Sequence, residues 1–144
     1  MADDARYRLA PLRDARERSE AVRRGDLARS VGDAQETEGQ LADARTRADH
    51  ARRGLDAALA TTAAATTAAQ RALADRFVAR RRRELALARD AEIRAEAAHG
   101  DRLGAVDVAR ARLARARAER ELIERHFTRW RESQKRLAER RADD

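Results

Sequence analysis

The feature that most constrains this chain is a seven-residue repeat of small apolar side chains through its first half. One row starts at Leu27, and a second row starts three residues later at Ser30. Two rows offset in this way share one face of an α-helix, as in a coiled coil. The rows are Leu27, Ala34, Leu41, Ala48, Leu55, Thr62 and Ala69, and Ser30, Thr37, Ala44, Ala51, Ala58, Ala65 and Ala72. We therefore expect a long helix with a narrow apolar face.

The second half carries a similar pair of rows with larger side chains. These rows are Val106, Leu113, Arg120 and Phe127, and Ala109, Ala116, Ile123, Trp130 and Leu137. Their spacing predicts a second amphipathic helix whose apolar face needs a partner. Folding back would bury the two faces against each other. The predicted fold class is therefore all-α, an elongated antiparallel two-helix coiled-coil hairpin that forms a single domain over residues 1–144.

Composition favours helix over disorder. The chain has 36 alanines and 32 arginines, which are strong helix formers, and its single proline is Pro11, where a first helical turn tolerates it. Disorder is the alternative, because charged residues make up 41% of the chain and aromatic residues only 3%. Proline-free helix-forming sequence after position 11 favours helix.

Two segments compete as the place where the chain turns. The midpoint sequence ATTAAATTAAQ, residues 60–70, contains four threonines, whose β-branching lowers helix propensity. It predicts a first helix over about 10–60, a turn over about 61–69 and a second helix over about 70–141. The rival is HGDRLG, residues 99–104, with two glycines. We prefer the midpoint because it gives arms of similar length, and the glycines then mark an irregularity or bend in the second helix.

Residue types that carry chemistry are sparse. The chain has no cysteine, its three histidines are far apart, and it lacks phosphate-binding glycine loops. We therefore expect no enzyme activity, no metal and no cofactor. No apolar run approaches the roughly 20 residues of a membrane span, and the first residues lack a signal-peptide core. These observations lead us to expect a cytoplasmic protein without direct membrane insertion.

Positive charge is concentrated in the second half. Residues 1–60 hold 12 arginines and 12 acids, so the whole net charge of +7 belongs to residues 61–144. Part of it is the run Arg80, Arg81, Arg82 and Arg83. Four consecutive residues point to every side of a helix, so they form no single stripe. Two interpretations stay open, a solvated charge run and a secondary basic patch that binds phosphate groups nonspecifically.

Both ends of the chain resemble a known family. The segments YRLAPLRDARERSEAVRR and ARLARARAERELIERHFTRWRESQKRLAERR are similar to the ends of YscO-type proteins of bacterial type III secretion and of their flagellar FliJ relatives. The resemblance implies a central stalk that binds the hexameric secretion ATPase, couples it to the export gate protein and in some members binds export chaperones. It also implies a cytoplasmic location, peripheral to the inner membrane through the secretion apparatus. Flagellar and virulence-type systems both remain open.

The resemblance also indicates which residues meet the ATPase. In such a stalk the helix ends enter the ring, and here those ends would bring Leu9 and Leu12 close to the C-terminal aromatic residues. The expected partner-binding residues are Leu9, Leu12, Phe127, Arg129, Trp130 and Arg131. Two other functions remain as alternatives. One is a basic coiled coil that binds nucleic acid, although no specific recognition motif is present, and the other is a generic helical adaptor.

Overall fold

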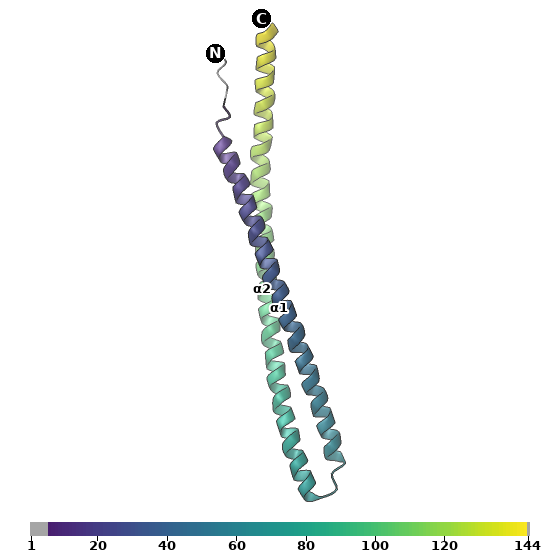
Figure 1. Cartoon of the computed structure of the whole chain (residues 1–144). Helices are drawn as coiled ribbons and strands as arrows, with labels where there is room; N and C mark the ends of the chain where they lie inside the picture. Colours follow the sequence, from purple (N-terminus) through teal and green to yellow (C-terminus); the bar gives the residue numbers. More distant parts are fainter. Residues whose placement is uncertain (1–5, 144) are drawn as a thin grey trace. The chain divides into compact units, whose positions relative to one another are not determined.

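The computed structural model describes residues 6–143 and consists of two long helices. Helix α1 spans Ala10–Ala63 and helix α2 spans Ala68–Asp143. The two run in opposite directions and are joined by residues 64–67 (Figure 1). The described part of the chain contains no strand. The predicted all-α two-helix hairpin is confirmed.

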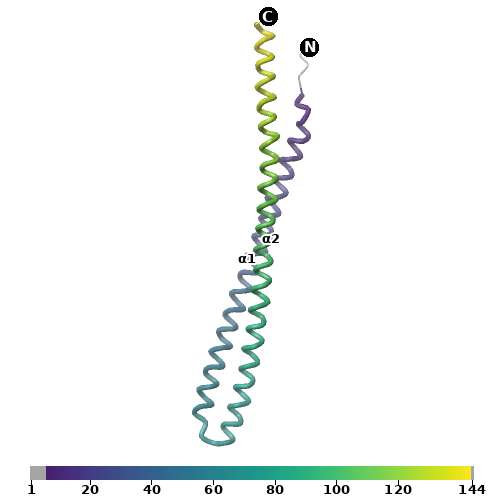
Figure 2. The backbone as a smooth tube through the Cα atoms, turned by 180° about the vertical axis from the view of Figure 1, so that it is seen from behind, coloured from purple at the N-terminus to yellow at the C-terminus, as the bar shows by residue number. Residues whose placement is uncertain are grey.

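The hairpin comprises two compact units. One is formed by Met1–Ser30 with Val106–Asp144, and we call it the terminal unit. The other is Val31–Ala105, which contains the turn, and we call it the turn unit. Each unit has a stretch of α1 against a stretch of α2, and Figure 2 shows the backbone of these stretches from behind.

The core of the turn unit is a seam of small residues. Its buried apolar side chains are Ala34, Leu41, Ala44, Ala48 and Ala58 from α1, and Val78 and Leu85 from α2. All five α1 residues belong to the predicted rows. Ala69 and Ala72 also belong to those rows but are exposed, because the chain has already turned and they lie in α2. Val78 and Leu85 lie 28 and 21 residues before Val106, so they extend its row by multiples of seven. The predicted row began only at Val106 and did not include them.

The core of the terminal unit follows the second predicted pair of rows. Val106, Ala109, Leu113, Ala116 and Ile123 are buried. Leu137 belongs to the same row but is 40% exposed and not part of the buried core. The physical reason is visible in Figure 1, where α2 continues past the first turn of α1 and leaves its last turns without an opposing helix.

A local hydrogen-bond network defines the turn. The hydroxyl of Thr67 accepts the backbone N–H of Gln70 at 3.1 Å, and the Gln70 side chain accepts the backbone N–H of Thr67 at 3.2 Å. This reciprocal pair is a capping box, which satisfies amide groups that the first turn of α2 would leave unpaired. The connection at 64–67 lies within the range 61–69 expected from the sequence.

The rival turn segment is helical throughout. Residues 99–104 lie inside α2, and neither Gly100 nor Gly104 has a positive φ. The expected irregularity at these glycines is therefore absent from the helix. A side chain added at either glycine would meet nothing within 4 Å. The two glycines thus occupy open positions on α2 and are not required by close packing.

Candidate partner-binding site

Four rings from the two ends of the chain meet in the terminal unit. Tyr7 lies 5.0 Å from Phe127 in an edge-on arrangement and 5.1 Å from Trp130, measured between ring centroids. Phe127 and Trp130 are stacked with centroids 5.8 Å apart. The Tyr7 hydroxyl lies 2.9 Å from Nδ1 of His126, within hydrogen-bonding distance. We call Tyr7, His126, Phe127 and Trp130 the aromatic cluster.

Local folding explains why these rings converge. Phe127 and Trp130 occupy the two heptad rows of α2, so both face α1. Tyr7 precedes α1, and its carbonyl accepts the backbone N–H of Ala10, the first residue of that helix. The Tyr7 side chain is buried, with a relative exposure of 9%. Tyr7 therefore covers Phe127 and Trp130 at the end of the seam, where α1 has not yet begun.

Arginines surround the aromatic cluster. The guanidinium of Arg13 lies 4.3 Å from the centre of the Phe127 ring, and that of Arg131 lies 5.9 Å from the same ring. Cations over an aromatic face are attracted by its quadrupole. Arg13 also donates to Glu124 at 2.6 Å, and this hydrogen bond raises the pKa of Arg13. The aromatic cluster is thus held together by stacking and bordered by positive charge.

Arg129 and Arg131 lie on the exposed surface on either side of Trp130. They border two different shallow hollows. Arg129 shares one with Glu121, Arg125 and Thr128, and Arg131 shares the other with Glu132 and Lys135. Neither hollow encloses a small molecule or brings catalytic side chains together.

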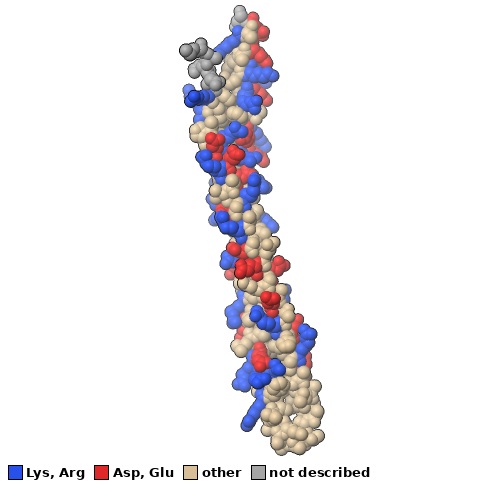
Figure 3. Space-filling model, viewed as in Figure 1, with Lys and Arg blue, Asp and Glu red and all other residues tan. Residues whose placement is uncertain are grey.

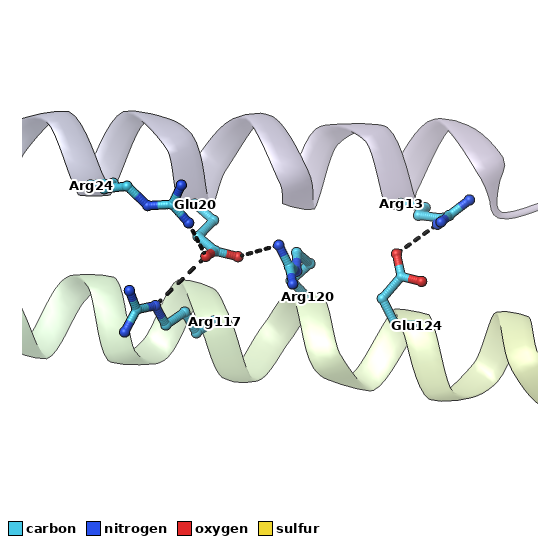
Figure 4. Close-up of polar contacts among 6 residues, drawn as sticks. All are labelled: Arg13, Glu20, Arg24, Arg117, Arg120 and Glu124. Carbon is cyan, nitrogen blue, oxygen red and sulfur yellow. Dashed lines mark hydrogen bonds and ion pairs between the residues drawn. The ribbon is translucent and has the colours of Figure 1, made fainter.

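A buried carboxylate lies further along the same seam. Glu20 has a side-chain exposure of only 5% and faces three arginines, at 2.9 Å from Arg24, 3.6 Å from Arg117 and 3.1 Å from Arg120 (Figure 4). The Arg120 contact is a close ion pair whose alignment falls short of a hydrogen bond, since Glu20 Oε2 has no hydrogen-bond partner. Figure 4 also shows the separate Arg13–Glu124 pair.

These ion pairs replace apolar contacts in the seam of the terminal unit. Counting back by sevens from Leu27 reaches Glu20 and then Arg13, so both occupy seam positions. Arg16 occupies the other row and pairs with Glu119 at 2.5 Å. Polar groups at seam positions favour one register, because other registers would leave a charge unpaired. The ion pairs thus fix which residues of α2 lie beside Tyr7.

The structure gathers some of the expected residues and not others. Phe127 and Trp130 lie together in the aromatic cluster, and Arg131 approaches it. Leu9 is half-buried, whereas Leu12 is 41% exposed. The predicted hairpin puts these two leucines against the aromatics and does not include Tyr7. One feature of the sequence could have pointed to Tyr7: it is the only tyrosine of the chain, and it lies just before the start of a helix.

The arginine run is divided in the turn unit. Arg81 lies in the seam beside Gly54, where a Cβ at that glycine would be 3.6 Å from the guanidinium. It pairs with Glu84 at 2.8 Å. Arg80 pairs with the same carboxylate at 3.4 Å and lies over the Phe77 ring. Arg82 and Arg83 are exposed. The expected secondary basic patch therefore has one member turned into the seam.

Other site types are not found among residues 6–143. No group of three or more histidine, cysteine or acidic side chains is placed to hold a metal ion. None of the described helical sequence is sufficiently long and apolar to cross a membrane.

Comparisons with protein-family models, with curated proteins and with solved structures give no match to this chain.

Proposed function

We propose that this chain is a non-enzymatic central stalk of a bacterial type III secretion system. It binds the hexameric secretion ATPase through its terminal unit and couples the ring to the export gate protein. Export chaperones are further proposed partners. The protein works in the cytoplasm, where its attachment to the secretion apparatus holds it next to the inner membrane.

The observation that carries this proposal is the aromatic cluster with its arginine border. Tyr7, Phe127 and Trp130 join the two helix ends, and Arg129 and Arg131 remain exposed beside them. The rigid apolar part holds the helices, while the exposed cations are available to a partner. Acidic loops inside a protein ring have the complementary charge, and such complementarity favours fast and specific association. The resemblance of both terminal segments to YscO-type and FliJ proteins supports the same assignment.

Nucleic-acid binding is the second candidate, and the exposed Arg82 and Arg83 are the observation that favours it. Contacts to phosphate groups would depend steeply on salt and little on base sequence. A generic helical adaptor is the third candidate and rests only on the hairpin itself.

One experiment separates the stalk from nucleic-acid binding. The full chain is titrated into the secretion ATPase of the same bacterium and, in parallel, into a duplex DNA, both at physiological salt. The stalk predicts saturable binding to the ATPase, a rise in its hydrolysis rate and little affinity for DNA. Tight DNA binding without any effect on the ATPase would replace the stalk by the nucleic-acid candidate. Binding to neither would leave the stalk proposal rejected.

A further inference from the structure

The turn unit ends in a region without charge. Residues 57–70 contain no acidic, basic or histidine side chain, and we call this stretch the uncharged cap. Figure 3 shows it as a continuous tan end of the hairpin on the face in view. Large apolar side chains are exposed in and next to it, with Leu59 at 42%, Leu73 at 71% and Phe77 at 37%. An open hollow lies among Ala64, Leu73 and Phe77.

Exposed arginines follow the uncharged cap along α2. We call Arg71, Arg76, Arg80, Arg82 and Arg83 the arginine collar. Between residues 52 and 84 the chain has eight arginines against three acids, a net charge of +5. Of those acids, Glu84 forms ion pairs with Arg80 and Arg81. Only two carboxylates therefore remain for the other six arginines. Most of the net charge of the chain therefore lies beside its least polar surface.

The geometry of the arginine collar distinguishes between kinds of partner. At about 100° per residue, the five arginines of the collar spread over about half of the helix circumference, the half turned away from the seam in which Arg81 lies, so they form a broad band and not a narrow stripe. A groove or a nucleic-acid duplex contacts one side of a helix, whereas a planar surface that meets the end of the hairpin contacts all sides. The uncharged cap surrounds the end, since it includes the last turns of α1, the connection and the first turn of α2.

The layers of a membrane surface match this order: apolar acyl chains lie deepest, where the uncharged cap would rest, and charged headgroups lie above them, beside the arginines. The hydrocarbon lies beneath a polar headgroup layer about 5–8 Å thick on each side. At 1.5 Å per residue, Arg71 and Arg76 lie about 5 Å and 12 Å along α2 from Ala68. Side chains on a helix lean toward its N-terminus, and α2 begins at the turn, so these arginines lean toward the uncharged cap. Arg80, Arg82 and Arg83 lie about 18–23 Å along α2 from Ala68, beyond the headgroup layer, where salt screens most of their attraction to the surface.

We propose that the turn end of this hairpin docks on an anionic lipid surface. The uncharged cap rests at the boundary of headgroups and acyl chains, and Arg71 and Arg76 of the arginine collar contact lipid phosphates. The sequence led us to expect no direct membrane insertion, because no segment is long enough for a span. Shallow docking needs no span, since a few apolar side chains and a polybasic segment together suffice for reversible attachment. This proposal is independent of the stalk function.

The test is sedimentation of the full chain with lipid vesicles. One set contains phosphatidylcholine alone, and the other contains phosphatidylcholine with about one third phosphatidylglycerol. Binding is expected only to the anionic vesicles, and raising the salt concentration is expected to weaken it. No sedimentation with anionic vesicles at physiological salt would overturn the proposal.

Matched variants separate the apolar contribution from charge. Leu59→Ser with Leu73→Ser is expected to weaken vesicle binding about tenfold or more. The control is Leu87→Ser with Leu122→Ser, which removes two leucines of 69% and 67% exposure from other parts of α2 and is expected to leave binding unchanged. Equal effects of the two pairs would contradict a docking site at the turn end.

A second pair of variants tests the arginine collar. Arg71→Glu with Arg76→Glu is expected to weaken vesicle binding at least 25-fold, because each arginine near an anionic surface contributes about fivefold. Arg110→Glu with Arg112→Glu changes net charge equally on exposed residues of the terminal unit and is expected to have a much smaller effect. Equal loss in both pairs would mean that net charge alone attracts the chain, and the proposal would fail.

A spectroscopic probe distinguishes lipid contact from binding to any polyanion. The chain has no cysteine, so Thr66→Cys offers a single attachment site for an environment-sensitive dye in the uncharged cap. Anionic vesicles are expected to shift its emission to the blue, whereas duplex DNA and a dye at Thr128→Cys are expected to give no shift. A dye at position 66 that remains in a watery environment while the chain sediments would overturn the proposal.

Discussion

At the scale of single residues, the N-terminal side of the seam in the terminal unit consists of one buried aromatic residue and several ion pairs, which face the apolar row of α2. The heptad rows continue back from Leu27 to Glu20 and Arg13, and from Ser30 to Arg23 and Arg16. Apolar periodicity ends where the side chains become charged, so it does not predict that the seam continues. Phe127 and Trp130 were found because they keep the apolar pattern. Tyr7 escaped because it lies outside a helix and follows no period.

Tyr7 is expected to shield Trp130 from water. Tyr7→Ala should lower the free energy of unfolding by about 2 kcal/mol, less than a fully enclosed aromatic because the site lies at the end of the seam. Trp130 is the only tryptophan, so its emission reports the change directly and should shift to the red. Tyr7→Phe removes only the contact with His126 and should cost about 1 kcal/mol. The control is Leu12→Ala at an exposed position, and an equal red shift there would contradict the assignment.

Glu20 is expected to determine the register of the two helices more than their stability. Glu20→Gln leaves three arginines facing a neutral side chain and should lower stability by about 1–3 kcal/mol, a limited loss because those arginines are partly exposed. Glu20→Leu places an apolar residue at a seam position and should be at least as stable as Glu20→Gln. Urea unfolding followed by circular dichroism measures both. A leucine variant clearly less stable than the glutamine variant would mean that position 20 is not part of the seam.

At the scale of elements, two helices and the seam of α1 followed from the sequence, because a seven-residue period determines which face is buried. The reach of the seam in α2 did not follow, since Val78 and Leu85 are separated from Val106 by seam positions filled with polar and small residues such as Glu92 and His99. His99 in fact faces α1, with Nδ1 3.1 Å from the Thr37 hydroxyl. The start of α2 depends on the capping box of Thr67 and Gln70, which composition does not reveal.

The capping box predicts a specific effect of Thr67. Thr67→Ala removes the side chain that accepts the Gln70 amide, so stability should fall by about 1 kcal/mol. Thr46→Ala is the control, because Thr46 is exposed in the middle of α1 and its hydroxyl donates only to the Ala42 carbonyl. That control should be neutral or slightly stabilising, since alanine is the better helix former. Chemical denaturation of the two variants measures the difference in stability. Equal stabilities would contradict a capping role of Thr67.

At the scale of the whole molecule, the two units carry different surfaces. The terminal unit has an aromatic cluster bordered by arginines, and the turn unit has an uncharged cap followed by an arginine collar. The proposed roles follow this division, with the ATPase at the terminal unit and a lipid surface at the turn unit. Net charge placed the positive excess in residues 61–144 but did not locate a binding surface, because charge counts contain no information on which arginines are already paired.

The most direct measurement is the stimulation of the secretion ATPase by a charge-reversed chain. Arg129→Glu with Arg131→Glu should leave helix content and unfolding nearly unchanged, because exposed charges contribute little to folding. It should nevertheless abolish most of the stimulation, since repulsion replaces attraction at the acidic surface of the ring. Arg110→Glu with Arg112→Glu, with the same spacing on α2, should stimulate like the unmodified chain. Full stimulation by the Arg129 and Arg131 variant at physiological salt would contradict docking through the terminal unit.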